Sequence, residues 1–205
     1  MKWIASLIFV VSVGVGLARG DDEGSSNNTE ANAAQTRGTK LLKERQYDQA
    51  IAAFNEAIRL DPKFSKAYLN RGAAFLIKRD FASAIADMNK VLEIDPGNHF
   101  ALMNRGTCYF RDNNLAKAID DFSAVIKTHP KEINAYFSRG TAYAHAGDTE
   151  QAIADFNKVV ELDPNHAKGY FNRGLAYAER GDQRLADADF AKAASLDPKL
   201  TPQQR

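Results

Sequence analysis

The chain of 205 residues is poor in cysteine and has almost no excess of either charge. It contains one cysteine, one tryptophan, and 27 Lys plus Arg against 26 Asp plus Glu, which gives a formal net charge of +1. A single cysteine excludes an intramolecular disulfide and leaves no thiolate cluster for a zinc or iron–sulfur site. Proteins that bind nucleic acid usually carry a basic excess that neutralises phosphates, so the balanced charge argues against that class.

The chain also lacks the motifs of the common enzyme classes. No nucleophile elbow, phosphate-binding loop or dinucleotide fingerprint is present. The histidines at 99, 129, 145 and 166 share no helical i, i+4 spacing and have no cysteine partners, so they do not resemble a metal site. Cys108 is better explained as a small buried side chain than as a reactive thiol. We therefore expect neither catalysis nor a bound cofactor.

Long apolar runs are confined to the N-terminus. Lys2 is followed by sixteen uncharged, largely apolar residues, and small residues such as Ala18 and Gly20 close the run. This pattern predicts a secretory signal peptide over residues 1–20, because the run is shorter than the roughly 20 residues that a membrane span needs. Retention of the leader as an N-terminal anchor is the alternative. The sequence thus predicts an exported protein, periplasmic in a Gram-negative bacterium and otherwise secreted, with no stable membrane insertion after cleavage.

A regular period of about 34 residues runs through the rest of the chain. An Arg-Gly pair, an alanine, an aromatic residue or Met, and a proline each recur five times with this spacing. The recurring residues are Arg37-Gly38, Arg71-Gly72, Arg105-Gly106, Arg139-Gly140 and Arg173-Gly174; Ala50, Ala84, Ala118, Ala152 and Ala186; Phe54, Met88, Phe122, Phe156 and Phe190; and Pro62, Pro96, Pro130, Pro164 and Pro198. Apolar residues at helical spacing predict two helices of about 13 residues in each copy. The glycine falls inside the first helix at a cost of about 1 kcal/mol, which implies that two helices approach closely there.

The residues between the two predicted helices of a copy suit a turn in three cases. Glycine or asparagine can adopt the left-handed conformation that ends one helix, and aspartate or asparagine can cap the next. Such pairs are Asn113-Asn114, Gly147-Asp148 and Gly181-Asp182, whereas the first two copies carry the less favourable Arg45-Gln46 and Arg79-Asp80.

The pattern resembles the tetratricopeptide repeat, in which an aromatic residue, a glycine, an aromatic, an alanine, an aromatic and a proline mark a helical hairpin of about 34 residues. The fourth copy reads Tyr136, Gly140, Tyr143, Ala152, Phe156 and Pro164. The copies span 31–64, 65–98, 99–132, 133–166 and 167–200, after a flexible linker at 21–30 and before a short tail at 201–205. An arginine replaces the family's usual leucine before the glycine in every copy. The resemblance implies an all-α fold, a right-handed superhelical solenoid of five helix-turn-helix units whose first helices line a concave face.

We expect a partner to bind at this concave face. Two residues before each glycine the copies carry Thr36, Asn70, Asn104, Ser138 and Asn172, and the resemblance implies that an asparagine there can hold the backbone of an extended peptide. One residue earlier stand Gln35, Leu69, Met103, Phe137 and Phe171, which helical geometry turns largely toward the groove. The predicted groove residues are Leu69, Asn70, Met103, Asn104, Phe110, Phe137, Phe171 and Asn172. Structural asparagines, and apolar side chains used in packing between repeats, are the alternatives that stay open.

An arginine–aspartate pair also recurs in repeats two to five. Asp87, Asp121, Asp155 and Asp189 each stand one residue before the aromatic residue or Met of the second helix. A ladder of ligand-binding charges and a repeated ion pair that fixes helix register both fit this spacing. We favour the ion pair, because an aspartate between core side chains needs a charged partner when it is buried. The first copy has Ala53 at this position, which leaves Arg37 more available to solvent or ligand.

These features predict an exported adaptor that binds a protein or peptide segment through its groove, in cell-envelope assembly or secretion. A groove that combines apolar pockets with amides suits such a partner. The alternative is a structural subunit that associates end to end into a homo-oligomer. The tail after Pro198 is too short to form a capping helix, so we expect the last helix pair to expose apolar surface.

Overall fold

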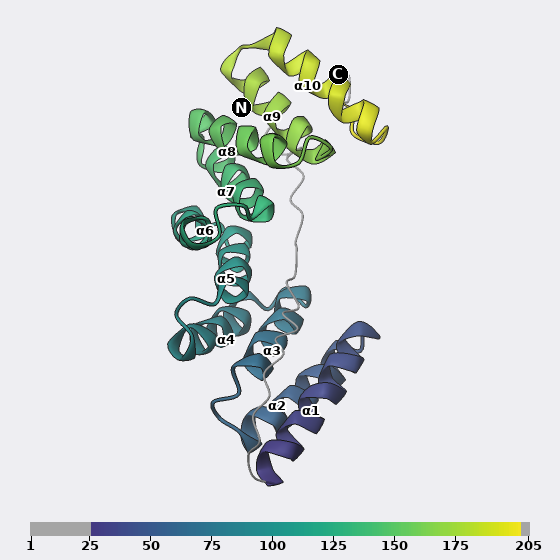
Figure 1. The fold of residues 1–205 in the computed structure, drawn as a ribbon, viewed down its shortest axis with the longest axis vertical. Coiled ribbons are helices and arrows are strands. Elements are labelled where there is room, and N and C mark those ends of the chain that lie inside the picture. The colour runs from purple at the N-terminus through teal and green to yellow at the C-terminus, as the bar shows by residue number, and fades with distance from the viewer. Residues whose placement is uncertain (1–25, 202–205) are drawn as a thin grey trace. The chain divides into compact units, whose positions relative to one another are not determined.

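Ten helices occupy most of residues 26–201, the part of the chain that this computed structural model describes (Figure 1). The chain divides into two compact units at Asn113. The first unit holds α1 (Ser26–Lys43), α2 (Tyr47–Leu60), α3 (Ser65–Ile77), α4 (Phe81–Ile94) and α5 (His99–Arg111). The second holds α6 (Leu115–Thr128), α7 (Ile133–Ala146), α8 (Thr149–Leu162), α9 (Ala167–Arg180) and α10 (Gln183–Leu196). No strand occurs in the described residues, which confirms the all-α prediction.

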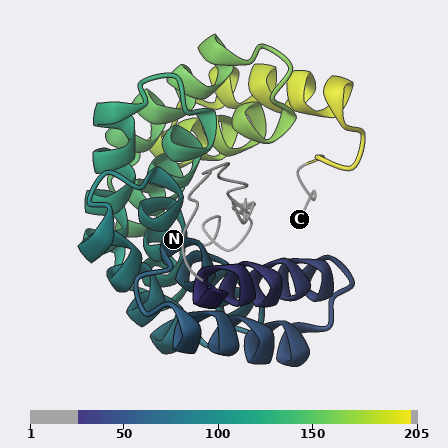
Figure 2. The same cartoon turned by 60° about the horizontal axis from the view of Figure 1, so that its bottom comes forward.

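Within each unit the helices pack as a stack of hairpins. In the first unit α1 pairs with α2 and α3 with α4, and each second helix also contacts the first helix that follows it, as α2 does with α3 and α4 with α5. The second unit repeats this order from α6 to α10. Figure 2 shows the pairing of α1 with α2 from a second side. Contacts between neighbours in sequence are those of a helical repeat fold. The right-handed superhelical path along all five copies stays a prediction.

The glycine of each Arg-Gly pair lies where two helices approach closely. A Cβ atom on Gly38 would lie 2.5 Å from Phe54 Cε1, and one on Gly174 would lie 2.8 Å from Phe190 Cε1. The Phe54 ring is completely buried, so it has little room to move aside. The predicted close approach is therefore confirmed at these positions.

The turn inside each hairpin contains a residue with positive φ. Gly147 (φ 82°), Gly181 (φ 95°) and Asn113 (φ 59°) adopt the left-handed conformation that the sequence predicts. Arg45 (φ 61°) and Arg79 (φ 64°) adopt it too, although an L-residue with a Cβ atom pays about 1 kcal/mol or more there. The hairpin turns of the first unit are thus strained at two arginines, whereas those of the second unit use glycine.

The N-terminal boundary of the array differs from the prediction. Helix α1 begins at Ser26, inside the stretch 21–30 that was expected to be a flexible linker, and it is longer than the other described helices. No glycine or proline occurs between Ser26 and the alanine-rich segment that follows, so no residue there breaks the helix. The predicted signal peptide at 1–20 and the end of the predicted tail lie outside the described residues.

The last hairpin is better closed than the sequence suggested. Leu200, just beyond the final proline of the repeats, is buried in one cluster with Phe171 and Phe190. On α10, Asp187 and Ala194 occupy positions where the earlier repeats carry Ile, Leu or Val. Leu185 is the large apolar side chain of this helix that remains exposed, at 40%. The predicted exposure of apolar surface is therefore found at Leu185 and is limited elsewhere, because small and acidic residues replace the apolar ones and the chain folds back over the core.

A histidine caps α9 in the second unit. The Nδ1 atom of His166 accepts a hydrogen bond from the backbone N–H of Gly169 at 2.8 Å. The imidazole ring lies 5.2 Å from the Phe137 ring, centroid to centroid. Burial lowers the pKa of His166, because the charged imidazolium would lose its hydration there. The folded chain thus favours the neutral form, the only form in which Nδ1 can accept a hydrogen bond.

We expect this cap to make the stability of the second unit depend on pH. The pKa of His166 is lower in the folded than in the unfolded chain, so stability is full well above the ordinary value of about 6.5 and declines as the pH falls through it. Loss of the cap costs about 1 kcal/mol, which lowers the thermal midpoint. His166→Asn keeps a neutral acceptor, as Asn98 provides for α5, and should lose less stability between pH values of about 7.5 and 5. Equal losses in the variant and the wild type would contradict this role for His166, since His145 titrates in both.

Candidate functional site

The apolar stripe predicted on the first helices is buried. The exposed fractions of Leu69, Met103, Phe137 and Phe171 are 5%, 8%, 2% and 6%. Leu69 lies in one cluster with Val91 of its own hairpin and Ala101 of the next. The expectation that these side chains face an open groove is wrong, because all four are buried and Leu69, Phe137 and Phe171 belong to the core clusters of their hairpins. The alternative of packing between repeats holds at Leu69, and Phe110 remains half-buried.

The asparagines beside this stripe are also buried. The exposed fraction is 1% for both Asn70 and Asn104 and 0% for Asn172. Asn70 on α3 and Asn104 on α5 belong to the first unit, where these two helices are in contact. Asn172 on α9 belongs to the second unit. The structure therefore brings Asn70 and Asn104 together with Leu69 and Met103 in one unit, while whether these residues bind a peptide stays a prediction.

A row of amide groups in the first unit lacks hydrogen-bond partners. The buried side-chain atoms without a partner in the described chain are Oε1 of Gln35, Oδ1 of Asn70, and both Oδ1 and Nδ2 of Asn104. They come from α1, α3 and α5, one residue on each first helix. Gln35 was not among the predicted groove residues, although it is the polar member of the stripe position in the sequence. The sequence marked Gln35 only as the one polar residue at a position that is apolar in the other copies.

Thr39 determines which atom of the Gln35 and Asn70 amides lacks a hydrogen-bond partner. Its hydroxyl donates to the backbone carbonyl of Gln35 at 3.0 Å, so its oxygen must accept the other hydrogen bonds. The amide nitrogens of Gln35 (3.3 Å) and Asn70 (3.4 Å) donate to that oxygen. The carbonyl oxygens of both amides are therefore the atoms without partners. A buried polar atom in this state costs about 1–3 kcal/mol, so the row marks a place where a polar group of another molecule would be stabilising.

The recurring spacing of arginine and aspartate produces a bridge between consecutive hairpins. Arg71 on α3 donates to Asp87 of α4 through Nε (2.9 Å) and Nη2 (2.6 Å). Its Nη1 donates to Asn55 Oδ1 of α2 at 2.6 Å, so one guanidinium holds the second helices of two hairpins. Arg139 and Arg173 make the same three contacts in the second unit. We call this arrangement the arginine bridge.

The sequence predicted the aspartate partners of this bridge but not its acceptors on the preceding hairpin. The aspartates were recognised, but the acceptors in the preceding hairpin were missed: Asn55, Asn89, Ser123 and Asn157 accept from Arg71, Arg105, Arg139 and Arg173. These acceptors also recur with the period of the repeat, so the signal was present. They were missed because a polar residue on the exposed side of a helix is ordinary and does not by itself indicate a partner.

The environment of the bridge makes it structural. The Arg139 guanidinium lies between the rings of Tyr136 (5.9 Å) and Tyr143 (5.8 Å). The hydrogen bonds to Asp155 raise the pKa of Arg139, while burial raises the pKa of Asp155 against the opposing effect of the arginine. The favoured interpretation as an ion pair is therefore confirmed for Arg71, Arg139 and Arg173, while its role in fixing helix register stays a prediction. In the first copy Arg37 pairs with Glu56 and its side chain is 54% exposed, which confirms its greater access to solvent.

No metal-binding cluster of three or more His, Cys, Asp or Glu side chains occurs within residues 26–201. Cys108 is completely buried, and burial raises the pKa of its thiol to about 12, so the reactive thiolate is suppressed. None of the described helices is both long and apolar enough to cross a bilayer.

Hairpins of about 34 residues that pack neighbour to neighbour define a helical repeat protein, of the class that binds partners along an extended surface. Four family models match the sequence. They are a tetratricopeptide repeat model over residues 36–99, another over 100–132, a TPR repeat model over 140–181 and a tetratricopeptide repeat model over 167–200. The chain is therefore built from tetratricopeptide repeats over most of its length. No curated protein matches its sequence.

Solved structures with the same fold include two of MamA and one of YrrB. A MamA crystal structure is 24% identical, with a TM-score of 0.76, over 83% of this chain and 93% of that chain. MamA from residue 41 to its end, from Desulfovibrio magneticus RS-1, is 22% identical, with a TM-score of 0.78, over 89% and 98%. YrrB, described as a TPR protein with an unusual peptide-binding site, is 24% identical, with a TM-score of 0.71, over 83% and 89%. These likenesses establish the fold.

Removal of one arginine from the bridge should be far more costly than removal of the exposed arginine of the first copy. Arg139→Met leaves Asp155, whose side chain is 6% exposed, without its charged partner, and should lower the free energy of unfolding by about 3 kcal/mol. Arg37→Met breaks an exposed pair and should change it by less than about 0.5 kcal/mol. Chemical denaturation of both variants measures the difference. Comparable losses would show that the bridge adds nothing to an ordinary surface pair.

Proposed function

We propose that this chain is an exported scaffold that binds a protein or peptide segment along the first helices of its repeats, in cell-envelope assembly or secretion. The observation that carries the proposal is the row of amide atoms without partners on α1, α3 and α5. The tetratricopeptide repeats support it, because stacked helical hairpins offer an extended surface to a partner. The description of YrrB as having a peptide-binding site concerns that protein, and it adds support by analogy.

The chemistry of the row fits a peptide backbone. The oxygens of Gln35 and Asn70 require N–H donors, and Asn104 offers an oxygen and an NH₂ group together. A peptide unit presents one N–H and one C=O, so it can satisfy both ends of the Asn104 amide. Adjacent packed helices lie roughly 8–10 Å apart, and an extended chain advances about 3.3 Å per residue. About every third residue of a bound segment would therefore meet the next first helix.

The amides can reach a ligand although they are buried. Asn70 and Asn104 are short side chains with two torsions on the surface of a helix, so a change of rotamer moves the amide without moving the backbone. In the present rotamers polar atoms of these amides lack hydrogen bonds, so a change of rotamer costs less free energy. A ligand that supplies the missing hydrogen bonds would favour the new rotamer by that difference.

Export is supported by the sequence of residues 1–20. A single lysine, an apolar run and closing small residues form the pattern of a secretory leader. The protein would then act in the periplasm of a Gram-negative bacterium or outside the cell. End-to-end association into a homo-oligomer has weaker support, because Leu200 is buried against the last core cluster and α10 presents alanine and aspartate where earlier repeats carry large apolar residues.

Replacement of the amides by leucine should separate binding from stability. In the double variant Asn70→Leu/Asn104→Leu the buried unsatisfied atoms are gone, so we expect an unchanged or higher melting temperature, with a gain of up to about 1 kcal/mol per site. The same variant should enrich no peptides from a displayed library of random 12-residue segments, whereas the wild type enriches extended ones. Asn165→Ala, at an exposed loop position, serves as the control and should behave as the wild type. The proposal is wrong if the leucine variant is folded and enriches the same peptides as the wild type.

A further inference from the structure

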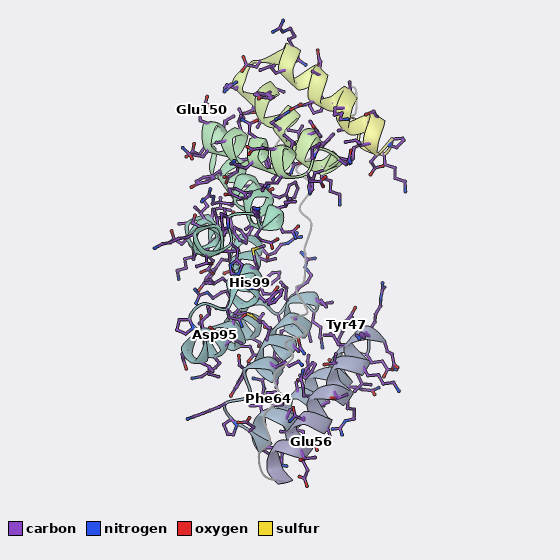
Figure 3. The ribbon with its side chains drawn as sticks, viewed as in Figure 1. Tyr47, Glu56, Phe64, Asp95, His99 and Glu150 are labelled. Carbon is purple, nitrogen blue, oxygen red and sulfur yellow. The ribbon has the colours of Figure 1, made fainter. Side chains whose placement is uncertain are left out.

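The hairpin turns of the first unit form one edge that is rich in cations. The exposed basic residues at this edge are Lys43, Arg45, Lys78, Arg79 and Arg111. In Figure 3, Tyr47 marks this edge at the start of α2, and Phe64 and His99 mark the opposite end of the hairpins. The edge lies at the C-terminal ends of α1, α3 and α5, whose carbonyl groups favour positive charge.

The three turns of this edge are neighbours in space. Lys78 beside the second turn forms an ion pair with Asp48 beside the first. Helices α3 and α5, which end at the second and third turns, are in contact, and partial burial together with the charge of Arg79 lowers the pKa of Arg111. The edge is thus a continuous surface within the first unit, on which positive charges repel one another.

Most acidic side chains of the same edge already form ion pairs or hydrogen bonds with other groups. Asp48 pairs with Lys78, and Glu44 lies 4.0 Å from Lys40. Asp80 caps α4 by accepting a hydrogen bond from the Ser83 N–H at 3.1 Å. Among the described residues, neither Arg45 nor Arg79 has an ion-pair partner, and Asp112 is the further acid at this edge. The guanidinium donors of these two arginines are consequently available to another molecule.

The backbone supplies an independent reason to assign the arginines a role. Arg45 and Arg79 have φ values of 61° and 64°, whereas the matching turns of the second unit contain Gly147 and Gly181. Glycine would relieve the left-handed strain at no steric cost. A residue that is conformationally unfavourable and unpaired within the described chain, twice in the same unit, is explained by what its side chain binds.

The edge is also aligned with the row of amides. Arg111 follows Asn104 by seven residues on α5, which is two helical turns and places both on one face about 10 Å apart. An extended segment covers that distance in about three residues. A peptide whose backbone meets the amide of Asn104 can therefore present a side chain to the cationic edge.

We propose that the cationic edge, through Arg45 and Arg79, binds carboxylate side chains of the partner, so that the segment recognised by the first unit is an acidic peptide. This inference rests on the proposed function, because it specifies the chemistry of the same partner. Carboxylates suit the edge because guanidinium groups bind them with two parallel hydrogen bonds. The second unit, with glycine in its turns and Arg180 paired with Glu150 and Asp182, provides no equivalent edge among its described residues.

The test uses the full chain and the double variant Arg45→Gly/Arg79→Gly. The probes are a fluorescent 12-residue peptide of alternating Glu and Ala and its Gln and Ala counterpart, with binding followed by anisotropy. The wild type should bind the Glu peptide more tightly than the Gln peptide, and added salt should reduce the difference. The double variant should bind the Glu peptide about fivefold more weakly and the Gln peptide unchanged. Its melting temperature should rise, because glycine removes the strain, so weaker binding could not result from unfolding.

A matched control removes two cations from the second unit, at exposed positions of its second helices. Lys127→Ala/Lys158→Ala changes the net charge equally and should retain wild-type affinity for both peptides. Equal wild-type affinity for the two peptides, no binding of the Glu peptide, or full retention by the glycine variant would each overturn the inference. Binding confined to phosphatidylserine vesicles would also overturn it. Asn70→Leu/Asn104→Leu should weaken the binding of both peptides alike. Binding of the Gln peptide that this variant leaves intact would count against the proposed function and not against the cationic edge.

Discussion

The stacking of this chain depends on a partly buried guanidinium that joins two hairpins. Arg71, Arg139 and Arg173 each lie against aromatic rings, bind an aspartate of their own hairpin and reach an acceptor on the preceding one. The family's usual residue here is leucine, which can pack but cannot choose a partner. A charged group with fixed donors imposes a distance and an orientation, so the bridge sets the register of each hairpin relative to its neighbour. Its value lies in specificity more than in net stabilisation, because burial of both charges offsets much of their attraction.

The first and the last copy each lack one part of the arginine bridge. At the N-terminal end the first copy has Ala53 instead of aspartate, and Arg37 makes an exposed pair. At the C-terminal end Ala191 stands where the acceptor for a following arginine would be. Other departures from ideal repeats gather in the first unit, which holds the strained turns and the unsatisfied amides. Locally unfavourable features that persist in a fold usually mark the surface on which function operates.

The regular period of the repeat made most of the fold predictable. Helix pairs, close approach at glycine, left-handed glycine turns and the pairing of Arg71 with Asp87 all follow from spacing and residue chemistry. The error over Leu69 and its equivalents has a definite cause. Helical geometry gives the direction of a side chain relative to its own helix, but the cover that an adjacent hairpin provides depends on tertiary packing. The same limit concealed Asn55 as an acceptor, and the capping of α9 by His166 had no signal stronger than its place before the helix.

A double-mutant cycle between Arg173 and Asn157 measures the central claim, that the arginine holds consecutive hairpins together. Asn157 contributes the acceptor from α8, and the distance from Arg173 Nη1 is 2.8 Å. Free energies of unfolding for Arg173→Met, Asn157→Ala and the double variant give the coupling energy of this contact alone. A bridge between hairpins predicts a coupling of about 1 kcal/mol, the value of a hydrogen bond to a charged group at a partly exposed site. Additive effects of the two substitutions would contradict it, because the arginine would then act only within its own hairpin.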